Sequence, residues 1–408
     1  MNKEKYQLHT KEISINIVQT EINSIRRKDI LKTGIRIYKD GKIGVAGSLG
    51  KYDENKLEHD AIENLNLNIP YEYPLTKNVN REEVKIAELS ENEFVNQTEK
   101  MLKTIKEKHN DFIFSNKIVL KDSIKLLEND LNTRLYSENK YFSFELGFKH
   151  KDSINILDGF IGYESFDFSY DKFINMIDEI CNAYNTIIDI KEGEYPIIFT
   201  SSDFTLLKKF YTDLNGLSFG GGSSIFSDKL NKKLFSDNFT LYQSRNYDDG
   251  IIWDFFDAEG TTNTDDRCSL IENGVLKSPY TDKKTSKMFN LPLTGAAGGE
   301  YDSVPSIGYV PLIIKKSDKT IKELLNGENG ILVFVASGGD FTPEGKFGTP
   351  VQLAFMYDGE RILGRVPEFK LNSDLYRMFG DAFRGVGRNS ILSLDKVYGA
   401  VIDMKVVR

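Results

Sequence analysis

The sequence contains few residues of the kinds that bind transition metals. Its 408 residues include only four histidines and two cysteines. Zinc sites in proteins are built mainly from these two residue types, so any such site must draw on these few positions. The histidines are not spaced to bind one ion from a single helix, and we expect structural or solvated roles for all of them, at His9, His59, His109 and His150.

Long apolar segments and secretory features are also absent. No segment approaches about 18 consecutive apolar residues, and the charged start of the chain, Met1 to Tyr6, is followed by no apolar run. We therefore expect neither a membrane-spanning segment nor a signal peptide. Cys181 and Cys268 lack CxxC spacing and a secretory context, which favours two unpaired thiols in a reducing cytoplasm.

A basic charge excess is missing as well. Lysine and arginine number 53 against 61 aspartates and glutamates, a net charge of −8. This balance argues against a general role in binding nucleic acid or anionic membranes. With 40% hydrophobic residues the chain can bury a large core, and at roughly 150 residues per domain its length favours two or three domains.

The N-terminal half combines strand and helix patterns. Apolar and polar residues alternate over 13–18 and 35–38, and Asp40-Gly41 predicts a tight hairpin into a further strand. The segment 67–85 loses this periodicity and is interpreted as a connector. Ser90 with Glu93 then forms a capping box at the start of a long helix.

Strand patterns return between residues 111 and 165, and helical spacing follows at Phe173, Ile174, Ile177 and Ile180. The fold class expected is therefore α+β, with an N-terminal domain that packs long helices against an antiparallel sheet.

A polar stretch around Gly193 marks the expected boundary between two domains, 1–190 and 191–408. Beyond it, 196–199 reads as a short buried strand, and Ser202-Asp203 follows as the N-cap of a helix with an apolar face. The rest of the chain is rich in glycine and in short strands. We expect a C-terminal domain that is mainly β and barrel-like.

Two stretches of this domain resemble ligand-binding motifs only weakly. The run Gly220-Gly221-Gly222 lacks the spacing and the lysine of a phosphate-binding loop, which favours a flexible loop beside a packing contact. The acidic residues between Asp254 and Asp266 lack the order of an EF-hand calcium loop and are interpreted as a solvated loop.

One block of the C-terminal half carries a family resemblance. Asp257-Ala258-Glu259-Gly260 is followed by Ile271-Glu272-Asn273-Gly274-Val275-Leu276-Lys277 and then by a segment from Lys283 to Met288. This arrangement closely resembles the TldD/PmbA family, and the segment Gly34 to Gly44 agrees with the same family. The resemblance runs over nearly the whole chain, from about Ile13 to the final strand.

The resemblance implies an N-terminal α+β domain, a β-rich C-terminal domain and dimers that enclose a cavity. In this family the TldD-type subunit carries a helix with the motif H-E-x-x-x-H. Its two histidines, with a cysteine from near the C-terminus, hold a zinc ion that activates water, and its glutamate acts as general base.

This sequence departs from that motif at each ligand. The motif helix should begin after the strand 196–199, where Thr200 to Leu207 contains no histidine. No cysteine occurs at 383–388, where the third ligand should lie, and Cys268 precedes the block at Ile271 instead of following it. The resemblance is thus to the PmbA/TldE-type subunit, with no catalytic, cofactor-binding or metal-binding residue expected in this chain.

We accordingly expect a non-metal subunit that forms a chamber for peptide substrates, while a TldD-type partner supplies zinc and performs hydrolysis. The alternative is a homodimeric binding or scaffold protein of the same fold with no peptidase role. A hydrolase with an unrecognised carboxylate site is a third, weaker alternative. Candidate cavity or interface residues are Asp257, Glu259, Gly260, Gly220, Gly221 and Gly222.

Overall fold

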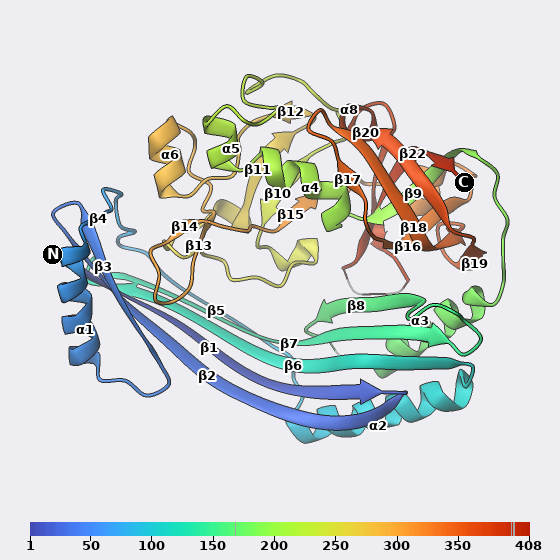
Figure 1. Ribbon diagram of the computed structural model, residues 1–408, viewed down its shortest axis with the longest axis horizontal. Coiled ribbons are helices and arrows are strands. Elements are labelled where there is room, and N and C mark those ends of the chain that lie inside the picture. Colours follow the sequence, from blue (N-terminus) through green and yellow to red (C-terminus); the bar gives the residue numbers. More distant parts are fainter. Residues whose placement is uncertain (168, 393, 395) are drawn as a thin grey trace.

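The N-terminal part of the chain forms a long, curved sheet with helices on one face (Figure 1). The structure is a computed structural model that describes residues 1–167, 169–392, 394 and 396–408. The strands of this part are β1 (Asn2–Val18), β2 (Glu21–Lys39), β3 (Lys42–Leu49), β4 (Ile69–Pro70), β5 (Asn80–Ile86), β6 (Phe112–Asn129), β7 (Thr133–His150) and β8 (Gly159–Ser165). Its helices are α1 (Glu54–Glu63), α2 (Glu91–Lys108) and α3 (Tyr170–Tyr184), with a 3₁₀ turn at Asn64–Leu67.

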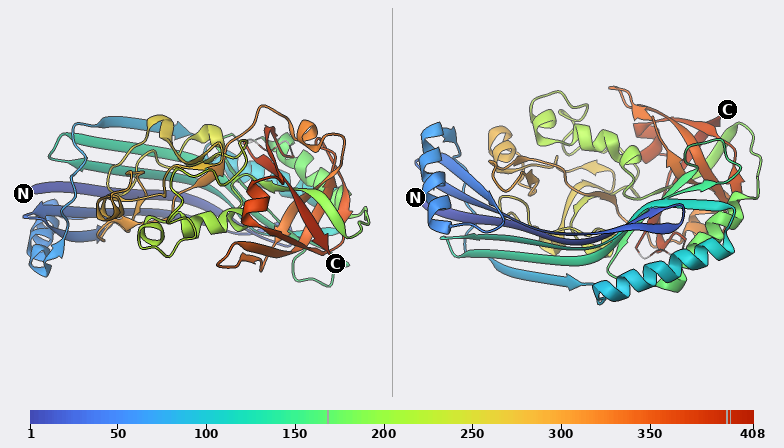
Figure 2. Two further views of the ribbon diagram at one scale, coloured as in Figure 1. Left: turned by 90° about the horizontal axis from the view of Figure 1, so that it is seen from above. Right: turned by 60° about the horizontal axis from the view of Figure 1, so that its bottom comes forward.

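The strand order is β4-β3-β2-β1-β6-β7, and both β5 and β8 pair with the outer edge of β7. All these pairs are antiparallel except β5 with β7. In Figure 1 and in the right view of Figure 2, α2 lies across the sheet from the C-terminal part. The predicted antiparallel sheet with long helices is therefore confirmed.

The connector expected over 67–85 is wrong at its end, because β5 begins at Asn80. Exposed and half-buried residues alternate along this strand, and its exposed positions include Val84 and Ile86. A strand at the edge of a sheet can leave apolar side chains exposed in this way. The sequence of β5 therefore lacks the alternation of apolar and polar residues that would have predicted a strand.

Local sequence explains how several of these elements begin and turn. Asp40 and Gly41 both have positive φ, 51° and 73°, the backbone of a two-residue hairpin turn that joins Lys39 to Lys42. Ser90 accepts a hydrogen bond from the backbone N–H of Glu93, whose side chain accepts one from the N–H of Ser90. Both the hairpin and the capping box match the sequence predictions.

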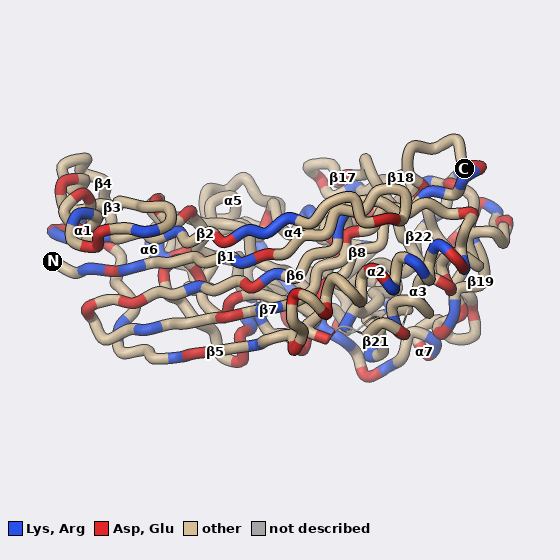
Figure 3. Tube along the Cα trace, turned by 90° about the horizontal axis from the view of Figure 1, so that it is seen from below, with Lys and Arg blue, Asp and Glu red and all other residues tan. Residues whose placement is uncertain are grey.

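Part of β2 lies at an edge of the sheet. Strand β3 pairs only with residues 32–39 of β2, so among the described residues 21–31 have a neighbouring strand on one side only. Figure 3 shows a run of basic residues along this stretch, from Arg26 to Lys28. Charged side chains on an exposed edge disfavour pairing with strands of other chains.

The C-terminal part begins at β9 and is mainly β. Its strands are β9 (Gly193–Thr200), β10 (Leu241–Ser244), β11 (Arg267–Glu272), β12 (Val275–Leu276), β13 (Ala297–Gly298), β14 (Ser306–Ile307), β15 (Leu312–Ile314), β16 (Gly330–Ala336), β17 (Asp340–Phe341), β18 (Lys346–Tyr357), β19 (Ile362–Val366), β20 (Phe369–Asp374), β21 (Phe383–Ser390) and β22 (Tyr398–Val407). Short helices lie between them: α4 (Phe204–Asp213), α5 (Gly216–Gly220), α6 (Lys283–Phe289), α7 (Ile321–Leu325) and α8 (Leu375–Phe379), with 3₁₀ turns at Tyr247–Asp249 and Thr264–Asp266.

Five of these strands close into a barrel. They pair in the order β16-β9-β22-β20-β18, and β18 pairs again with β16. The barrel-like C-terminal domain expected from the sequence is thus confirmed. Closure leaves these five strands without the unpaired edge that an open sheet would expose.

The strand β9 shows how the two parts share a core. Ile197 and Phe199 lie in one apolar cluster with residues from the barrel and from α4, whereas Ile198 lies in another with α2, α3 and the N-terminal sheet. Both faces of the strand are therefore buried, which explains its uninterrupted apolar run. The proposed boundary between residues 190 and 191 stays a prediction.

A loop of the C-terminal part also rests on the N-terminal sheet, on the opposite side of the molecule from α2. The connection between β13 and β14 reaches β2 (Figure 1), where a Cβ atom added to Gly34 would lie 1.7 Å from the carbonyl oxygen of Tyr301. Glu300 pairs with Lys32 at 3.2 Å beside this contact. Only a glycine allows the two backbones to approach so closely.

Replacing Gly34 by alanine should therefore lower the free energy of unfolding by about 1–3 kcal/mol, because the loop or the strand must move. The matched control is Gly193→Ala at the start of β9, where the nearest atom to the new Cβ would be 3.7 Å away. Urea denaturation of both variants measures the difference. Equal stability of the two variants would contradict the close contact.

No helix among the described residues is both long and apolar enough to cross a membrane.

Candidate functional site

The first part of the candidate site is the turn from β9 into α4, where the sequence resemblance places the zinc-binding helix of the TldD type. Of the predicted cap residues Ser202-Asp203, Asp203 is the N-cap of α4, and its carboxylate accepts a hydrogen bond from the N–H of Leu206 at 2.8 Å. Burial raises the pKa of Asp203, although the backbone N–H groups at the helix start oppose this shift.

The residues of α4 do not fit a zinc ion. The helix contains no histidine or cysteine, and its two nearest carboxylates are engaged in the fold. Asp203 caps the helix, and Asp213 pairs with Lys209 at 2.9 Å and accepts the N–H of Ile225 at 2.8 Å. These contacts hold the carboxylates in structural roles.

Each histidine ring pairs with a carboxylate. The distances are 2.6 Å for His9 and Asp29, 3.3 Å for His59 and Glu63, 2.7 Å for His109 and Asp178, and 3.6 Å for His150 and Asp111. Within the described part of the chain, no three or more histidine, cysteine, aspartate or glutamate residues are grouped to hold a metal ion. Cys181 is buried, and burial raises the pKa of its thiol.

A pocket of about 220 Å³ lies beside the start of α4. It is lined from β8, from the loop before β11 and from the segment that leads into β15, by Glu164, Ser202, Tyr211, Gly250, Ile251, Ile252, Trp253, Tyr309, Pro311 and Leu312. The pocket thus lies between the N-terminal sheet and the C-terminal part.

Aromatic rings form one wall of this pocket. Tyr211 of α4 stacks on Tyr309, with ring centroids 5.1 Å apart, and the two hydroxyl groups are hydrogen-bonded at 2.9 Å. Trp253 lies 6.1 Å from Tyr309 on one side, and Phe204 lies 5.2 Å from Tyr211 on the other. Trp253 is 39% and Tyr309 58% exposed, so two large rings face solvent next to a pocket.

The sequence did not indicate this aromatic pocket. Glu164, Trp253 and Tyr309 lie on an edge strand and in two loops, where no periodic pattern distinguishes them. The one available signal was that Trp253 is the only tryptophan of the chain.

The second part of the candidate site is a buried turn at Asp257. Its carboxylate accepts hydrogen bonds from the backbone N–H groups of Glu259 and Thr261 at 2.9 and 2.8 Å, and from that of Ala297 at 3.0 Å. Asp257 is 1% and Glu259 2% exposed, so the solvated loop expected from the sequence is wrong for these two residues. A carboxylate with three backbone donors fixes the path of the chain.

Glu259 joins this turn to both parts of the protein. Its carboxylate accepts the hydroxyl of Tyr71 at 2.8 Å and the N–H of Lys283, the first residue of α6, at 2.9 Å. Burial, reinforced by the nearby charge of Asp257, raises the pKa of Glu259 to about 7.

An ion pair from β1 and β2 lies against the same turn. Arg36 is 0% exposed and Glu4 1%, and they pair at 3.1 Å. The Arg36 guanidinium also donates to the carbonyl of Ala258 at 2.5 Å and lies over the ring of Tyr6 at 4.6 Å. Tyr38 donates to the Glu4 carboxylate at 2.9 Å.

The raised pKa of Glu259 predicts a pH-dependent stability. Between the ordinary value near 4.5 and about 7, the folded protein keeps a proton on Glu259 that the unfolded chain releases. The free energy of unfolding should therefore fall as the pH rises through this window and level off above it. The contribution is at most about 3 kcal/mol.

Glu259→Gln should flatten this part of the pH profile, because glutamine stays neutral and can still bond to Tyr71 and Lys283. Glu300→Gln, an exposed carboxylate paired with Lys32, is the matched control and should keep the wild-type profile. Urea denaturation between pH 4.5 and 8 measures both. An unchanged slope in Glu259→Gln would contradict the assignment.

The glycine candidates occupy two different places. Gly260 has φ 72° beside the Asp257 turn, and a Cβ there would lie 3.2 Å from Thr76. Gly220 ends α5, where a Cβ would lie 2.1 Å from the ring of Phe289 at the end of α6, whereas a Cβ at Gly222 would meet open space.

Helix α6 therefore contacts both predicted groups, Glu259 at its start and Gly220 at its end. The structure places Asp257, Glu259 and Gly260 together, and it separates Gly220, Gly221 and Gly222 from them. Their roles as cavity or interface positions stay predictions.

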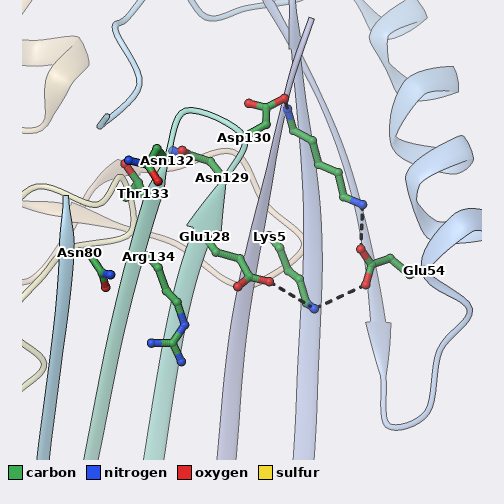
Figure 4. Close-up of a pocket in the computed structure, with 10 residues that line it drawn as sticks. Lys5, Glu54, Asn80, Glu128, Asn129, Asp130, Asn132, Thr133 and Arg134 are labelled. Atoms are coloured by element: carbon green, nitrogen blue, oxygen red, sulfur yellow. Dashed lines mark hydrogen bonds and ion pairs between the residues drawn. The ribbon is translucent and has the colours of Figure 1, made fainter. Parts of the chain in front are cut away.

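A further pocket, of about 360 Å³, lies at the end of the N-terminal sheet (Figure 4). Several of its charged residues pair with each other: Lys5 lies 3.5 Å from both Glu54 and Glu128, and Lys3 lies 2.8 Å from Glu54. Arg134 pairs with Glu82, which lies outside the pocket, at 2.9 Å.

Comparison with known proteins supports the family resemblance. The sequence profile described as the PmbA/TldA metallopeptidase C-terminal domain matches residues 192–399. An uncharacterised protein from Methanocaldococcus jannaschii is 23% identical over 413 aligned residues, covering 91% of this chain and 88% of that protein.

Solved structures share the whole fold. TldE from Thermococcus kodakarensis superposes with a TM-score of 0.80 at 19% identity, covering 100% of this chain and 96% of that one. A protein from Thermotoga maritima, described as a candidate modulator of a DNA gyrase, has a TM-score of 0.79 at 17% identity, with 100% and 96% covered. At these identities the likeness concerns the fold alone.

Proposed function

The chain belongs to the PmbA/TldD family, and on that premise we propose that it is the non-metal subunit of a cytoplasmic peptidase complex. A TldD-type partner, which carries the H-E-x-x-x-H helix, binds zinc and performs hydrolysis. This chain contributes part of the wall of a chamber that receives peptides.

The observation that carries the proposal is the chemistry of α4. In the position of the family's zinc-binding helix, this chain has no histidine, and the carboxylates at the two ends of α4, Asp203 and Asp213, are held by a helix cap and an ion pair. A zinc-activated water requires free ligands and a general base at this position. The exposed aromatic rings beside α4 are in keeping with a surface that contacts peptides.

The test is to express this chain together with a TldD-type protein encoded by the same genome and to purify each through a tag on the other. We expect one complex with zinc bound only to the partner, and hydrolysis of unfolded peptides by the complex. The partner with its first motif histidine replaced by alanine is the control, since it should assemble with this chain but lose zinc and activity.

Two results would overturn the proposal. If the two chains form separate homodimers and peptidase activity does not depend on this one, the alternative of a homodimeric binding or scaffold protein is favoured. If this chain alone binds zinc stoichiometrically and hydrolyses peptides, the assignment of chemistry to the partner is wrong.

A further inference from the structure

The pocket beside α4 has an unusual combination of lining residues. One wall consists of the aromatic rings of Tyr211, Trp253 and Tyr309, and another consists of the aliphatic side chains of Ile251, Ile252, Pro311 and Leu312. At about 220 Å³ it is smaller than the roughly 300–1,000 Å³ of most drug-sized ligand sites. It suits a single side chain better than a whole cofactor.

The charge that lines the pocket is negative. Among its lining residues Glu164 is the only charged one. Lys121 is a cation that interacts electrostatically with this carboxylate. Its Nζ lies over the ring of Tyr141, 5.8 Å from the ring centroid, and Lys121 does not line the pocket. An anionic ligand would find no cation among these residues, whereas a cationic ligand would find a carboxylate and the exposed rings of Trp253 and Tyr309.

We propose that this pocket binds the side chain of a lysine or arginine residue in a peptide. The aliphatic wall packs against the methylene groups of the side chain, as apolar surfaces do with such stems elsewhere. The rings of Trp253 and Tyr309 attract the cationic group through their negative faces, and Glu164 pairs with it. This inference rests on the proposed peptide-binding function and adds to it a preferred residue type.

The stacked pair of Tyr211 and Tyr309 gives the pocket a fixed wall. The Tyr211 hydroxyl bonds to that of Tyr309 at 2.9 Å and accepts the N–H of Leu312 at 3.0 Å, so the wall is tied to the start of β15. Rings that are held in place before a ligand arrives lose little conformational freedom on binding.

Because Trp253 is the only tryptophan, its fluorescence reports directly on this pocket in the full-length chain. The ligand to use is a tripeptide with blocked ends and lysine between two alanines. The same tripeptide with norleucine keeps the chain of methylene groups but has no charge. Free butylamine carries the cation without a peptide.

We expect the lysine peptide to change the fluorescence saturably and to bind about tenfold more tightly than the norleucine peptide. Butylamine should bind more weakly than the lysine peptide. Glu164→Gln should weaken binding of the lysine peptide by about the same factor and leave binding of the norleucine peptide unchanged. Tyr309→Leu removes a ring without adding a charge, and it should also weaken binding of the lysine peptide.

The matched control is Glu82→Gln on strand β5, because it removes the same charge from an exposed carboxylate paired with Arg134 at 2.9 Å. It should bind the lysine peptide as the wild type does. Circular dichroism of each variant confirms that it is folded before it is titrated.

Equal binding of the lysine and norleucine peptides would overturn the cation preference, and so would equal losses of lysine-peptide binding in Glu164→Gln and Glu82→Gln. If butylamine binds as tightly as the lysine peptide, the peptide part of the inference is wrong. All titrations use this chain without a partner, so their failure is distinct from a failure to assemble with a TldD-type subunit.

Discussion

Replacing Arg36 by methionine should lower the free energy of unfolding by about 3–5 kcal/mol. The guanidinium and its partner Glu4 are both buried, at 0% and 1% exposure. Methionine fills much of the same volume, but it leaves the Glu4 carboxylate without its counter-charge in a site that water does not reach. The carbonyl of Ala258, which Arg36 also bonds, loses its donor.

Loss of one partner should be costly, because the hydrogen bonding of the Arg36–Glu4 pair is already incomplete. One oxygen of Glu4 and two nitrogens of Arg36 are buried without a hydrogen-bond partner. The Glu4 carboxylate would then depend on the hydroxyl of Tyr38, which donates to its other oxygen. An uncompensated buried charge costs more than the pair contributes while it is intact.

The matched control for this substitution lies on the same strand. Arg27 pairs with Glu91 at 2.9 Å but is 62% exposed, and Arg27→Met should change stability little. Adding Glu4→Gln to Arg36→Met should recover part of the loss, since the remaining partner is then neutral. Urea denaturation followed by circular dichroism measures each variant. Equal stability of Arg36→Met and Arg27→Met would show that the buried Arg36–Glu4 pair does not stabilise the fold.

Replacing Phe210 by alanine should also cost about 3–5 kcal/mol. Phe210 lies on the buried face of α4, and its ring is 5.0 to 6.1 Å from those of Phe379, Phe235, Phe239 and Phe226. Phe226, Phe235 and Phe239 lie in the connection between α5 and β10, and Phe379 lies in α8, so the cavity left by the ring cannot close through the movement of one side chain.

Phe204→Ala, on the exposed face of the same helix, is the control for Phe210. Phe204 is 53% exposed and stacks on Tyr211, so its loss should change stability little. The two variants remove the same side chain from one helix, and their difference isolates the effect of burial. Denaturation midpoints that agree within error would contradict the role of Phe210 in the core.

The sequence predicted elements whose signals are local. The hairpin at Asp40-Gly41, the capping box at Ser90 and the helix after Asp203 are set by residues a few positions apart, and all are present. The family motif likewise directed attention to Asp257 and Glu259. The residues of the motif did not show that both carboxylates are buried. Some of the hydrogen-bond donors to these carboxylates lie far away in the sequence, at Ala297, Tyr71 and Lys283.

Features that depend on distant residues could not be predicted in this way. Closure of the barrel requires β16 to pair with both β9 and β18, and the aromatic pocket brings Tyr211 against Tyr309, 98 positions later. The partner strand of β5 is β7, which begins 53 positions after it. Periodicity reports which face of an element is buried and gives no information about what covers it.

The order of strands in the barrel has a consequence for synthesis of the protein. β22, residues Tyr398–Val407, lies between β9 and β20, so the ring cannot close until the ribosome has made this strand. Every strand of the N-terminal sheet ends by Ser165 and can pair much earlier during translation. Until β22 emerges, β9 keeps an unpaired edge, which can pair with strands of other chains in that interval.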